Sequence, residues 1–365
     1  MMKKLNISAN FMVFSLIIAA LLAAPLGLSD FRINLLGKFV SFAILAIGID
    51  LIWGYTGILS LGHGVFFGLG GYVMGMYLKL EASGGKLPDF MSWSGLTQLP
   101  LIWQPFTHVW SLVFVILLPA ALALILGWLT FKNRIRGVYF SILSQALSII
   151  FVVLFIGQQA YTGGTNGITN FTTLFGQPLI LDEMRITLYY VSVALLILTY
   201  AYCRFIVTHR IGRILVAIRD GENRVRFSGY NPAAYKIFVY VSSAAIAGLA
   251  GAIFVPQVGI ISPAEMGIVP SIEMVIWVAI GGRGTLVGAI IGAICVNALK
   301  SGISESFPEI WSYFIGMAFI IFVLFMPKGL IGMLHSCQAR WNMRFSPSSM
   351  DGIEKESTSI SSPRA

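Results

Sequence analysis

Long apolar runs separated by short polar segments extend over most of the 365-residue chain. A helix needs roughly 20 residues, at 1.5 Å per residue, to cross about 30 Å of hydrocarbon. The runs predict ten transmembrane helices, at residues 11–28, 34–53, 57–79, 109–130, 137–157, 186–206, 236–255, 268–280, 285–300 and 311–327. We therefore expect an all-α integral membrane protein, a polytopic bundle of about ten transmembrane helices with Gly-rich broken or short helices.

The composition supports this class and excludes others. Hydrophobic residues make up 57% of the chain, charged residues only 11%, and the formal net charge is +9. The basic residues gather in short segments between apolar runs, where lipid phosphates attract them, so no nucleic-acid partner is predicted. The cysteines lie far apart, without the spacing of a metal site, so no metal is expected. They are Cys203, Cys295 and Cys337.

The positive charges also predict the topology. Basic residues at Lys3–Lys4, Lys132–Arg136 and Arg204–Lys236 fall on one side of the predicted helices, which the positive-inside rule makes the cytoplasm. The first helix resembles a signal peptide but is expected to be retained. Tail residues Arg340 and Arg344 then place both termini in the cytoplasm, which requires an even number of crossings. Residues 1–345 are the predicted membrane domain, and residues 346–365 a disordered cytoplasmic tail.

The run from residue 268 to residue 300 decides the number of crossings. Its segment Gly281-Gly282-Arg283-Gly284 predicts a break between two short helices, which gives ten spans. One tilted helix across the run would give nine spans and is the open alternative. The break is either a hinge that moves or a plain tight turn, and candidate residues for the hinge are Gly281, Gly282, Gly284 and Thr285.

A first glycine-rich segment, Trp53–Tyr72, lies at membrane depth. It is either a broken helix beside a transport pathway or a small-residue packing face. The candidate pathway residues here are Gly54, Thr56, Gly57, Ser60 and His63. Ser60 and His63 lack the orienting acid of a hydrolase, so no catalytic residue is predicted.

Other polar residues near membrane depth are also candidates. Asp50 is either functional or a helix-end group, and Glu273 is a candidate pathway residue. The external segment 158–185 adds Gly164 and Asn166, whereas Trp93, Trp103 and Trp110 fit an interfacial belt. The chain has no GxxxxGK[ST] sequence, so it holds no nucleotide or other cofactor of its own.

A polar segment, residues 208–234, is predicted to project into the cytoplasm. Ile211, Ile214, Leu215 and Ile218 recur at helical spacing and are followed by a turn at Asp220–Asn223. Such a helix suits docking to a partner, or alternatively lies flat on anionic lipid. The candidate coupling residues are Arg219, Asp220, Glu222, Asn223, Arg226 and Gly229.

Five short motifs occur together in one order and carry a family resemblance. They are Gly54-Tyr55-Thr56-Gly57, Leu59-Ser60-Leu61-Gly62-His63, Gly163-Gly164-Thr165-Asn166-Gly167, Ala217-Ile218-Arg219-Asp220 with Gly229, and Gly281-Gly282-Arg283-Gly284-Thr285. The ordered set resembles the permease family of ABC importers for branched-chain amino acids, and within it the second permease of urea importers.

The resemblance implies a permease subunit in a bacterial inner membrane. It also implies three kinds of protein partner: a second permease subunit, two cytoplasmic ATPase subunits that hold ATP and Mg, and an extracytoplasmic solute-binding protein. Membrane lipid is a further expected partner because the chain spans the membrane. The expected solute is urea, with a branched-chain amino acid as the alternative. A passive channel or secondary transporter would share the hydropathy but would not need the cytoplasmic segment.

Overall fold

The computed structural model describes residues 2–84, 86–135, 137–306, 313 and 316–317. Most of the predicted last span, together with Arg340, Arg344 and the predicted tail 346–365, lies outside the described residues. The helices in chain order are α1 (Met2–Ala23), α2 (Asp30–Thr56), α3 (His63–Ala82), α4 (Asp89–Trp93), α5 (Phe114–Lys132), α6 (Val138–Gly157), α7 (Gln159–Thr162), α8 (Asp182–Thr208), α9 (Arg210–Phe227), α10 (Pro232–Val258), α11 (Ile268–Gly281) and α12 (Leu286–Ser306).

Short elements connect these helices. The 3₁₀ turns are η1 (Ala24–Leu26), η2 (Gln104–Thr107), η3 (Val109–Val113), η4 (Gly164–Asn166) and η5 (Pro263–Met266). Strand β1 (Ile168–Thr169) pairs antiparallel with β4 (Ile260–Ile261), and β2 (Thr173–Leu174) pairs with β3 (Gln177–Pro178). Each pair has two residues a strand, so the fold is a helical bundle, as predicted.

Six described helices are long and apolar enough to cross a membrane: those within Asp30–Thr56, Val109–Lys132, Val138–Gly157, Asp182–Thr208, Pro232–Val258 and Leu286–Glu305. The apolar stretches Phe11–Leu26 and Ile268–Gly281 are shorter. The polytopic all-α class is therefore confirmed, while the number of ten crossings stays a prediction. The run from residue 268 to residue 300 forms two helices, α11 and α12, so the single-helix alternative for that run is wrong.

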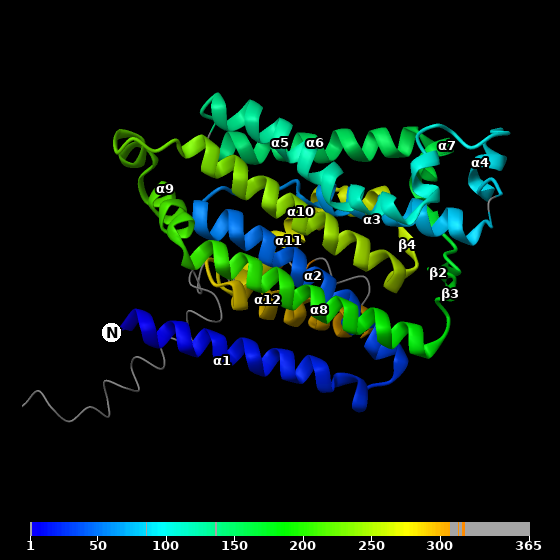
Figure 1. Cartoon of the computed structure of the whole chain (residues 1–365), viewed down its shortest axis with the longest axis horizontal. Coiled ribbons are helices and arrows are strands. Elements are labelled where there is room, and N and C mark those ends of the chain that lie inside the picture. The colour runs from blue at the N-terminus through cyan, green and yellow to red at the C-terminus, as the bar shows by residue number, and fades with distance from the viewer. Residues whose placement is uncertain (1, 85, 136, 307–312, 314–315, 318–365) are drawn as a thin grey trace, which may run out of the picture.

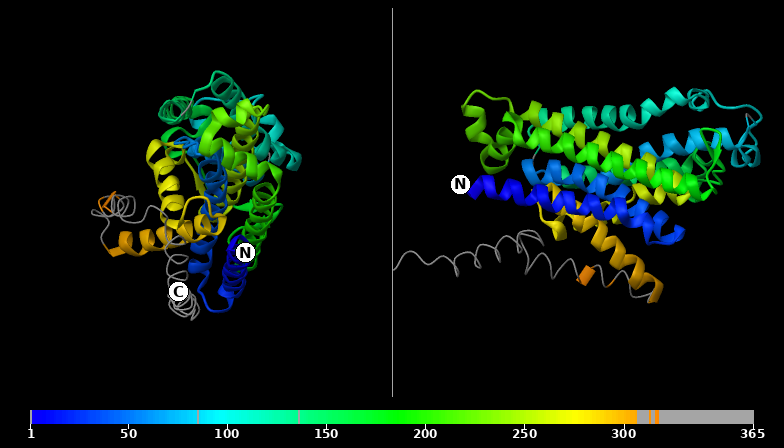
Figure 2. Two further views of the ribbon diagram at one scale, coloured as in Figure 1. Left: turned by 90° about the vertical axis from the view of Figure 1, so that its left-hand side faces the viewer. Right: turned by 60° about the horizontal axis from the view of Figure 1, so that its bottom comes forward.

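The long helices run roughly along one axis of the molecule (Figure 1). Helix α9 and the start of α1 lie at one end, which we call the α9 end; α4 and the β2–β3 hairpin lie at the opposite end (Figures 1 and 2). The N-terminal end of the chain and the basic segment thus share a side, in agreement with the predicted topology. Which side faces the cytoplasm stays a prediction.

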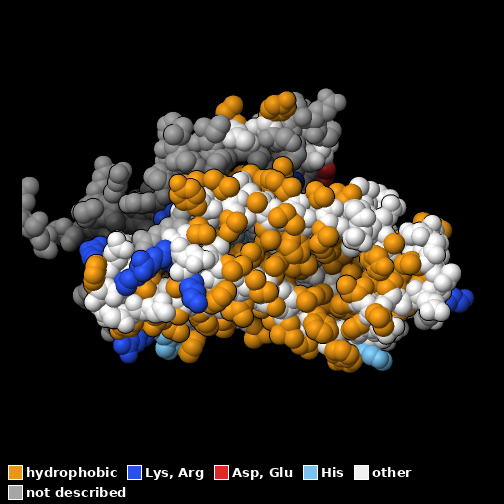
Figure 3. Space-filling model, turned by 90° about the horizontal axis from the view of Figure 1, so that it is seen from above, with side chains coloured by type: hydrophobic (Ala, Val, Ile, Leu, Met, Phe, Trp, Pro, Cys, Tyr) orange, Lys and Arg blue, Asp and Glu red, His pale blue; other side chains and the backbone are white. Residues whose placement is uncertain are grey.

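Burial separates central helices from peripheral ones. In the apolar window of α2, 83% of residues are buried, against 17% in α6. Helix α10 contacts α2, α3 and α5 at the bundle centre. Seen from above, the surface is a broad apolar area with Lys and Arg gathered toward the α9 end (Figure 3). Large exposed apolar side chains on α5 and α6 suit contact with lipid tails.

Glycines let α3 and α10 approach closely. A Cβ placed on Gly70 would lie 2.1 Å from the carbonyl oxygen of Gly248, and one on Gly251 would clash with the oxygen of Phe67. Both separations are far below van der Waals contact. The packing interpretation therefore holds for the glycines of α3.

The chain is not helical between α2 and α3. Gly57 ends α2 with a φ of +76°, and residues 57–62 run without helix to His63. Ser144 Oγ accepts from the Leu61 amide at 2.9 Å, and Ser141 Oγ donates to the Leu59 oxygen at 2.8 Å. Serines of α6 thus take over hydrogen bonds that helical neighbours would supply. The break in helical structure is confirmed, while its place beside a transport pathway stays a prediction.

A second non-helical stretch leads from α10 to α11 through β4 and η5. The Gly64 amide donates to Ser271 Oγ at 3.2 Å, which joins the first turns of α3 and α11. Both His63 and Ser271 are fully buried. Two helices therefore begin side by side inside the bundle, an arrangement that transport proteins use.

One aromatic prediction is wrong. Trp103 is fully buried, because its ring packs against Phe90 and its Nε1 donates to the Tyr161 oxygen at 3.0 Å. Trp93 and Trp110 are 85% and 58% exposed, as an interfacial position requires.

Candidate functional site

Helix α9 is kinked at Gly221, whose φ of −178° and ψ of 77° are not helical. The kink lies inside the turn predicted at Asp220–Asn223. It divides α9 into two short helical parts, and together they form the connection between α8 and α10.

The apolar side of α9 faces its own chain. Leu215 and Ile218 are at most 3% exposed, Val225 is 8% exposed, and Ile211 and Ile214 are half-buried. Helices α2, α8 and α10 contact α9. The predicted docking of this apolar face into a groove of a partner is therefore wrong, because the bundle itself covers it.

Arg219 fastens α9 to the end of α2. Its Nη1 donates to the Gly54 oxygen at 2.7 Å, and its Nε donates to Asp220 Oδ1 at 3.0 Å. The carbonyls of the last helical turn lack partners within the helix, and a cation there is favourable to the helix dipole. A Cβ on Gly57 would lie 3.0 Å from Arg219 Cγ, so the glycine keeps room for this side chain.

Asp50, one turn earlier on α2, holds the turn between α11 and α12. This fully buried carboxylate accepts from the Gly284 amide at 2.6 Å. Gly282 and Gly284 have φ values of +122° and +77°, a conformation that side chains oppose. A Cβ on Gly54 would lie 2.6 Å from the Gly284 nitrogen, so the approach needs glycine at residue 54.

Arg219, Gly54, Asp50 and Gly284 thus form one connected cluster, which we call the junction. It joins α9, the end of α2 and the α11–α12 turn through two hydrogen bonds between residues distant in sequence. Thr285 Oγ1 donates to the Gly282 oxygen at 2.6 Å and steadies the turn. The junction brings together predicted coupling residues and predicted hinge residues.

Glu222 lies inside this end of the molecule and does not face outward as predicted. It pairs with Lys236 of α10 at 2.6 Å and with Arg226 at 3.4 Å. The Glu222 and Lys236 side chains are only 13% and 7% exposed. The ion pair therefore fixes α9 against α10. Removing one partner would leave the other charge largely buried without it, so we expect loss of the pair to destabilise this end of the molecule.

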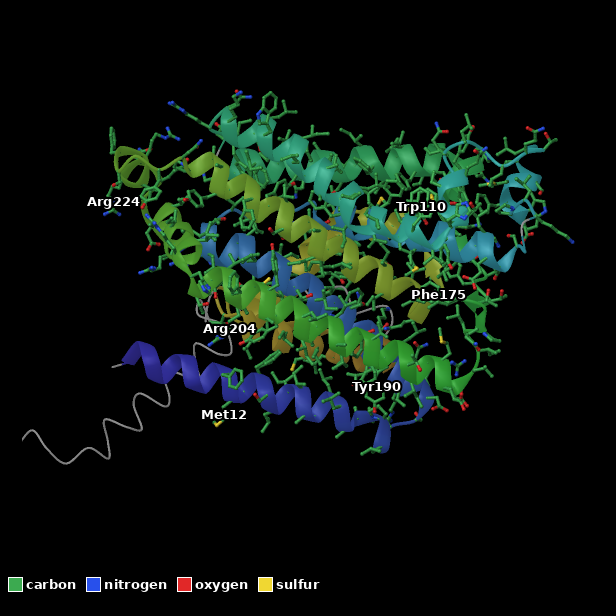
Figure 4. All side chains as sticks on the ribbon, in the orientation of Figure 1. Met12, Trp110, Phe175, Tyr190, Arg204 and Arg224 are labelled. Atoms are coloured by element: carbon green, nitrogen blue, oxygen red, sulfur yellow. The ribbon has the colours of Figure 1, made fainter. Side chains whose placement is uncertain are left out.

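The outer side of α9 is grooved. A depression of about 670 Å³, which we call the α9 groove, is lined by Arg210, Arg213, Ile214, Ala217, Asp220, Gly221, Arg224, Val225, Ser228 and Tyr230. Arg224 projects from this end of the bundle (Figure 4). Asn223 is also exposed, and Gly229 ends the element with a φ of +84° that only glycine adopts readily.

Three of the predicted pathway residues are buried side chains: His63, Ser60 and Thr56. His63 Nε2 lies 2.7 Å from Ser243 Oγ, which itself donates to the Gly48 oxygen at 2.5 Å. This chain of hydrogen bonds links α3, α10 and α2. Thr56 Oγ1 donates to the Ile52 oxygen of its own helix, and Ser60 is buried.

The remaining predicted residues lie elsewhere. Gly164 and Asn166 belong to η4, which follows α6 and α7 at the end opposite α9. Gly281 packs directly on the Gly288 oxygen, in the contact between α11 and α12. Glu273 pairs with Lys300 at 2.7 Å.

The structure also contains a polar cavity of about 390 Å³ between α2, η5, α11 and α12. Its charged lining residues include Lys38, Glu265, Glu273 and Lys300. Glu273 of this cavity was predicted from the sequence, but the two lysines were not. The missed lysines both fall inside predicted spans, 34–53 and 285–300. Since a charge at membrane depth is costly, that position was an available signal.

Comparison with known proteins places the chain in a family. Residues 31–324 match the family model described as branched-chain amino acid transport system / permease component. The chain is 25% identical over 345 residues to the high-affinity branched-chain amino acid transport system permease protein LivM of Salmonella typhimurium, covering 88% of this chain and 75% of the relative. No solved structure matches significantly.

Two further relatives show the breadth of the likeness. The permease protein BraD of Pseudomonas aeruginosa, also of a high-affinity branched-chain amino acid system, is 21% identical over 80% of this chain and 92% of its own length. The ribose import permease protein RbsC of Escherichia coli is 24% identical over 63% of this chain and 73% of its own length. The match across residues 31–324 shows that this multi-pass membrane protein belongs to the branched-chain amino acid transport system permease family.

Proposed function

We propose that this chain is a permease subunit of an ATP-driven importer in a bacterial inner membrane, and that its solute is urea. It would pair with a second permease subunit, receive solute from an extracytoplasmic binding protein, and be driven by two cytoplasmic ATPase subunits that bind ATP and Mg. In this arrangement the chain itself carries no catalytic residue.

The junction is the observation that carries the proposal. The Arg219–Gly54 bond of 2.7 Å and the Asp50–Gly284 bond of 2.6 Å connect α9 to three membrane helices at once, α2, α11 and α12. A partner that moves α9 would therefore move the ends of all three. A passive channel has no use for such a connection.

The α9 groove is the proposed ATPase contact. Its exposed residues include Arg213, Ala217 and Arg224, whereas the apolar side of α9 is buried against the bundle. A groove lined by cationic and apolar residues suits a protein partner with acidic and apolar side chains at its surface. The alternative of α9 lying on anionic lipid uses the same cations, but it leaves the junction without a role.

Substituting Arg219 tests the coupling role. In proteoliposomes holding the complete importer, Arg219→Met is expected to lower solute uptake at least tenfold while ATP hydrolysis continues. The methionine keeps much of the packing but cannot donate to the Gly54 oxygen. Lys86→Met, at an exposed position outside α9, is the control and should behave like wild type. Unchanged uptake by the Arg219 variant would reject the coupling role.

The solute assignment rests on a fuller resemblance to urea-importer permeases, which includes the segments Val255–Pro263 and Ile276–Thr285. Urea offers N–H donors and one carbonyl acceptor. The names of LivM and BraD support the alternative, a branched-chain amino acid, and the charges of both signs in the polar cavity suit a zwitterion.

Uptake of labelled urea and labelled leucine by the same reconstituted importer separates the two solutes. We expect ATP-dependent accumulation of urea, with leucine below a tenth of that rate. Accumulation of leucine without urea would assign the amino acid in its place.

A further inference from the structure

We propose that the polar cavity between α2, η5, α11 and α12 is a solute-binding site, in which Lys38 donates to an oxygen of the solute and Glu265 accepts from its N–H groups. The inference rests on the proposed transport function and deepens it. The chemistry is shared by urea, through its carbonyl and amide groups, and by an amino acid, through its carboxylate and ammonium.

The cavity holds one charged pair that is satisfied and one that is not. Glu273 and Lys300 bond to each other at 2.7 Å. Within the part of the chain that the structure describes, the Lys38 ammonium and the Glu265 carboxylate have no hydrogen-bond or ion-pair partner, although they are near enough to attract each other. Among the described residues, these two side chains therefore present an unpaired cation and an unpaired anion to one cavity.

A third polar group supports a built site. Trp277 also lines the cavity and is only 2% exposed, and its Nε1–H has no partner among the described residues. Leaving such a buried donor unpaired costs about 1–3 kcal/mol. A solute oxygen could satisfy this indole as well as Lys38.

The walls suit a small solute that is held at its polar groups. Apolar side chains from α2 and α11 line the same cavity, among them Phe39, Phe42 and Met274. The Lys38 ammonium lies 5.7 Å from the centre of the Phe42 ring. Such a cation–π contact lowers the cost of the lysine without using its three N–H donors.

A charged side chain such as Lys38 at membrane depth costs free energy, and a role in solute binding would explain its presence. A lysine at the centre of a bilayer costs about 3 kcal/mol on insertion scales, and unpaired charges inside membrane proteins commonly mark solute or ion paths. Lys38 lies 16 residues before Gly54 on α2, about 24 Å along the helix. The cavity is therefore well separated from the α9 groove.

The three helices that line the cavity are the helices that the junction joins. Lys38 belongs to α2, Glu273 and Trp277 to α11, and Lys300 to α12. At the other end, α2 bonds to the turn between α11 and α12 through Asp50. A shift of α9 would reach both sides of the cavity through these helices.

The test uses the complete importer in proteoliposomes, with labelled urea and labelled leucine as separate probes. Lys38→Met and Glu265→Gln are each expected to lower uptake of the transported probe at least tenfold, with basal ATP hydrolysis within twofold of wild type. Trp277→Phe keeps a ring but removes the N–H, and is expected to lower uptake about fivefold, the value of one hydrogen bond. Lys86→Met and Glu183→Gln, at exposed positions, are the controls.

The outcomes separate this inference from the proposed function. If wild type accumulates neither probe with ATP, the transport proposal itself fails. If wild type accumulates one probe and all three cavity variants equal it, the cavity is not a solute site. Should a single charge variant fail to co-purify with its partners, the double variant Lys38→Met/Glu265→Gln removes both charges together. Wild-type uptake by that assembled double variant also overturns the inference.

Discussion

Asp50 shows how one buried carboxylate can organise an end of the molecule. Its Oδ1 accepts from the Gly284 amide across 234 positions of sequence, at 2.6 Å. A carboxylate buried without this bond would be costly, so the contact explains why a charged residue is tolerated in an apolar helix. The two interpretations left open for Asp50 are compatible, since it lies near the end of α2 and also bonds to the turn between α11 and α12.

We expect Asp50→Ala to abolish the hydrogen bond from the Gly284 amide and Asp50→Asn to keep it. Asparagine retains an oxygen that can accept from Gly284, whereas alanine leaves the buried amide unpaired, at a cost of about 1–3 kcal/mol. Uptake by the reconstituted importer should fall at least tenfold for the alanine variant and no more than threefold for the asparagine variant. Equal uptake by the two would show that the hydrogen bond to Gly284 carries no function.

Helix α9 illustrates what the pattern along a chain can and cannot predict. The spacing of Leu215 and Ile218 predicted a helix with one apolar face, and the turn near Gly221 was also expected; both are confirmed. The pattern could not say what covers that face. Because burial by one's own chain and burial by a partner use the same residues, only the three-dimensional structure separates them.

The same limit applies to charges. Glu222 and Lys236 are 14 residues apart, and their pairing depends on how α9 returns against α10. Helix positions, by contrast, were predictable because an apolar run is a local property. The α11–α12 break was predictable for the same reason, since the glycines of the turn are adjacent in sequence.

Reversing a charge in the α9 groove should weaken partner binding without unfolding the bundle. Arg224 is exposed, so Arg224→Glu is expected to change stability by no more than about 0.5 kcal/mol. At an interface the same change can cost about 2 kcal/mol, a fall of over tenfold in affinity. The measurement is the amount of ATPase subunit that co-purifies with the membrane-inserted variant. Full co-purification would show that the ATPase contact does not lie in the α9 groove.

At the scale of the whole molecule, the two functional features lie at different places along α2. The α9 groove and the junction occupy the α9 end, whereas the polar cavity is lined by Lys38, about four turns of α2 before Gly54. Family membership accounts for a permease subunit, and under the proposed function the junction would transmit movement of α9 to α2, α11 and α12. The account requires that transport depend on partners that hydrolyse ATP.

The most direct measurement compares the purified chain alone with the complete importer in proteoliposomes, with ATP on the α9 side and labelled urea on the other. We expect accumulation against a gradient only with the complete importer, and only while ATP is hydrolysed; the chain alone should neither hydrolyse ATP nor concentrate solute. Concentrative uptake by the chain alone would contradict the account.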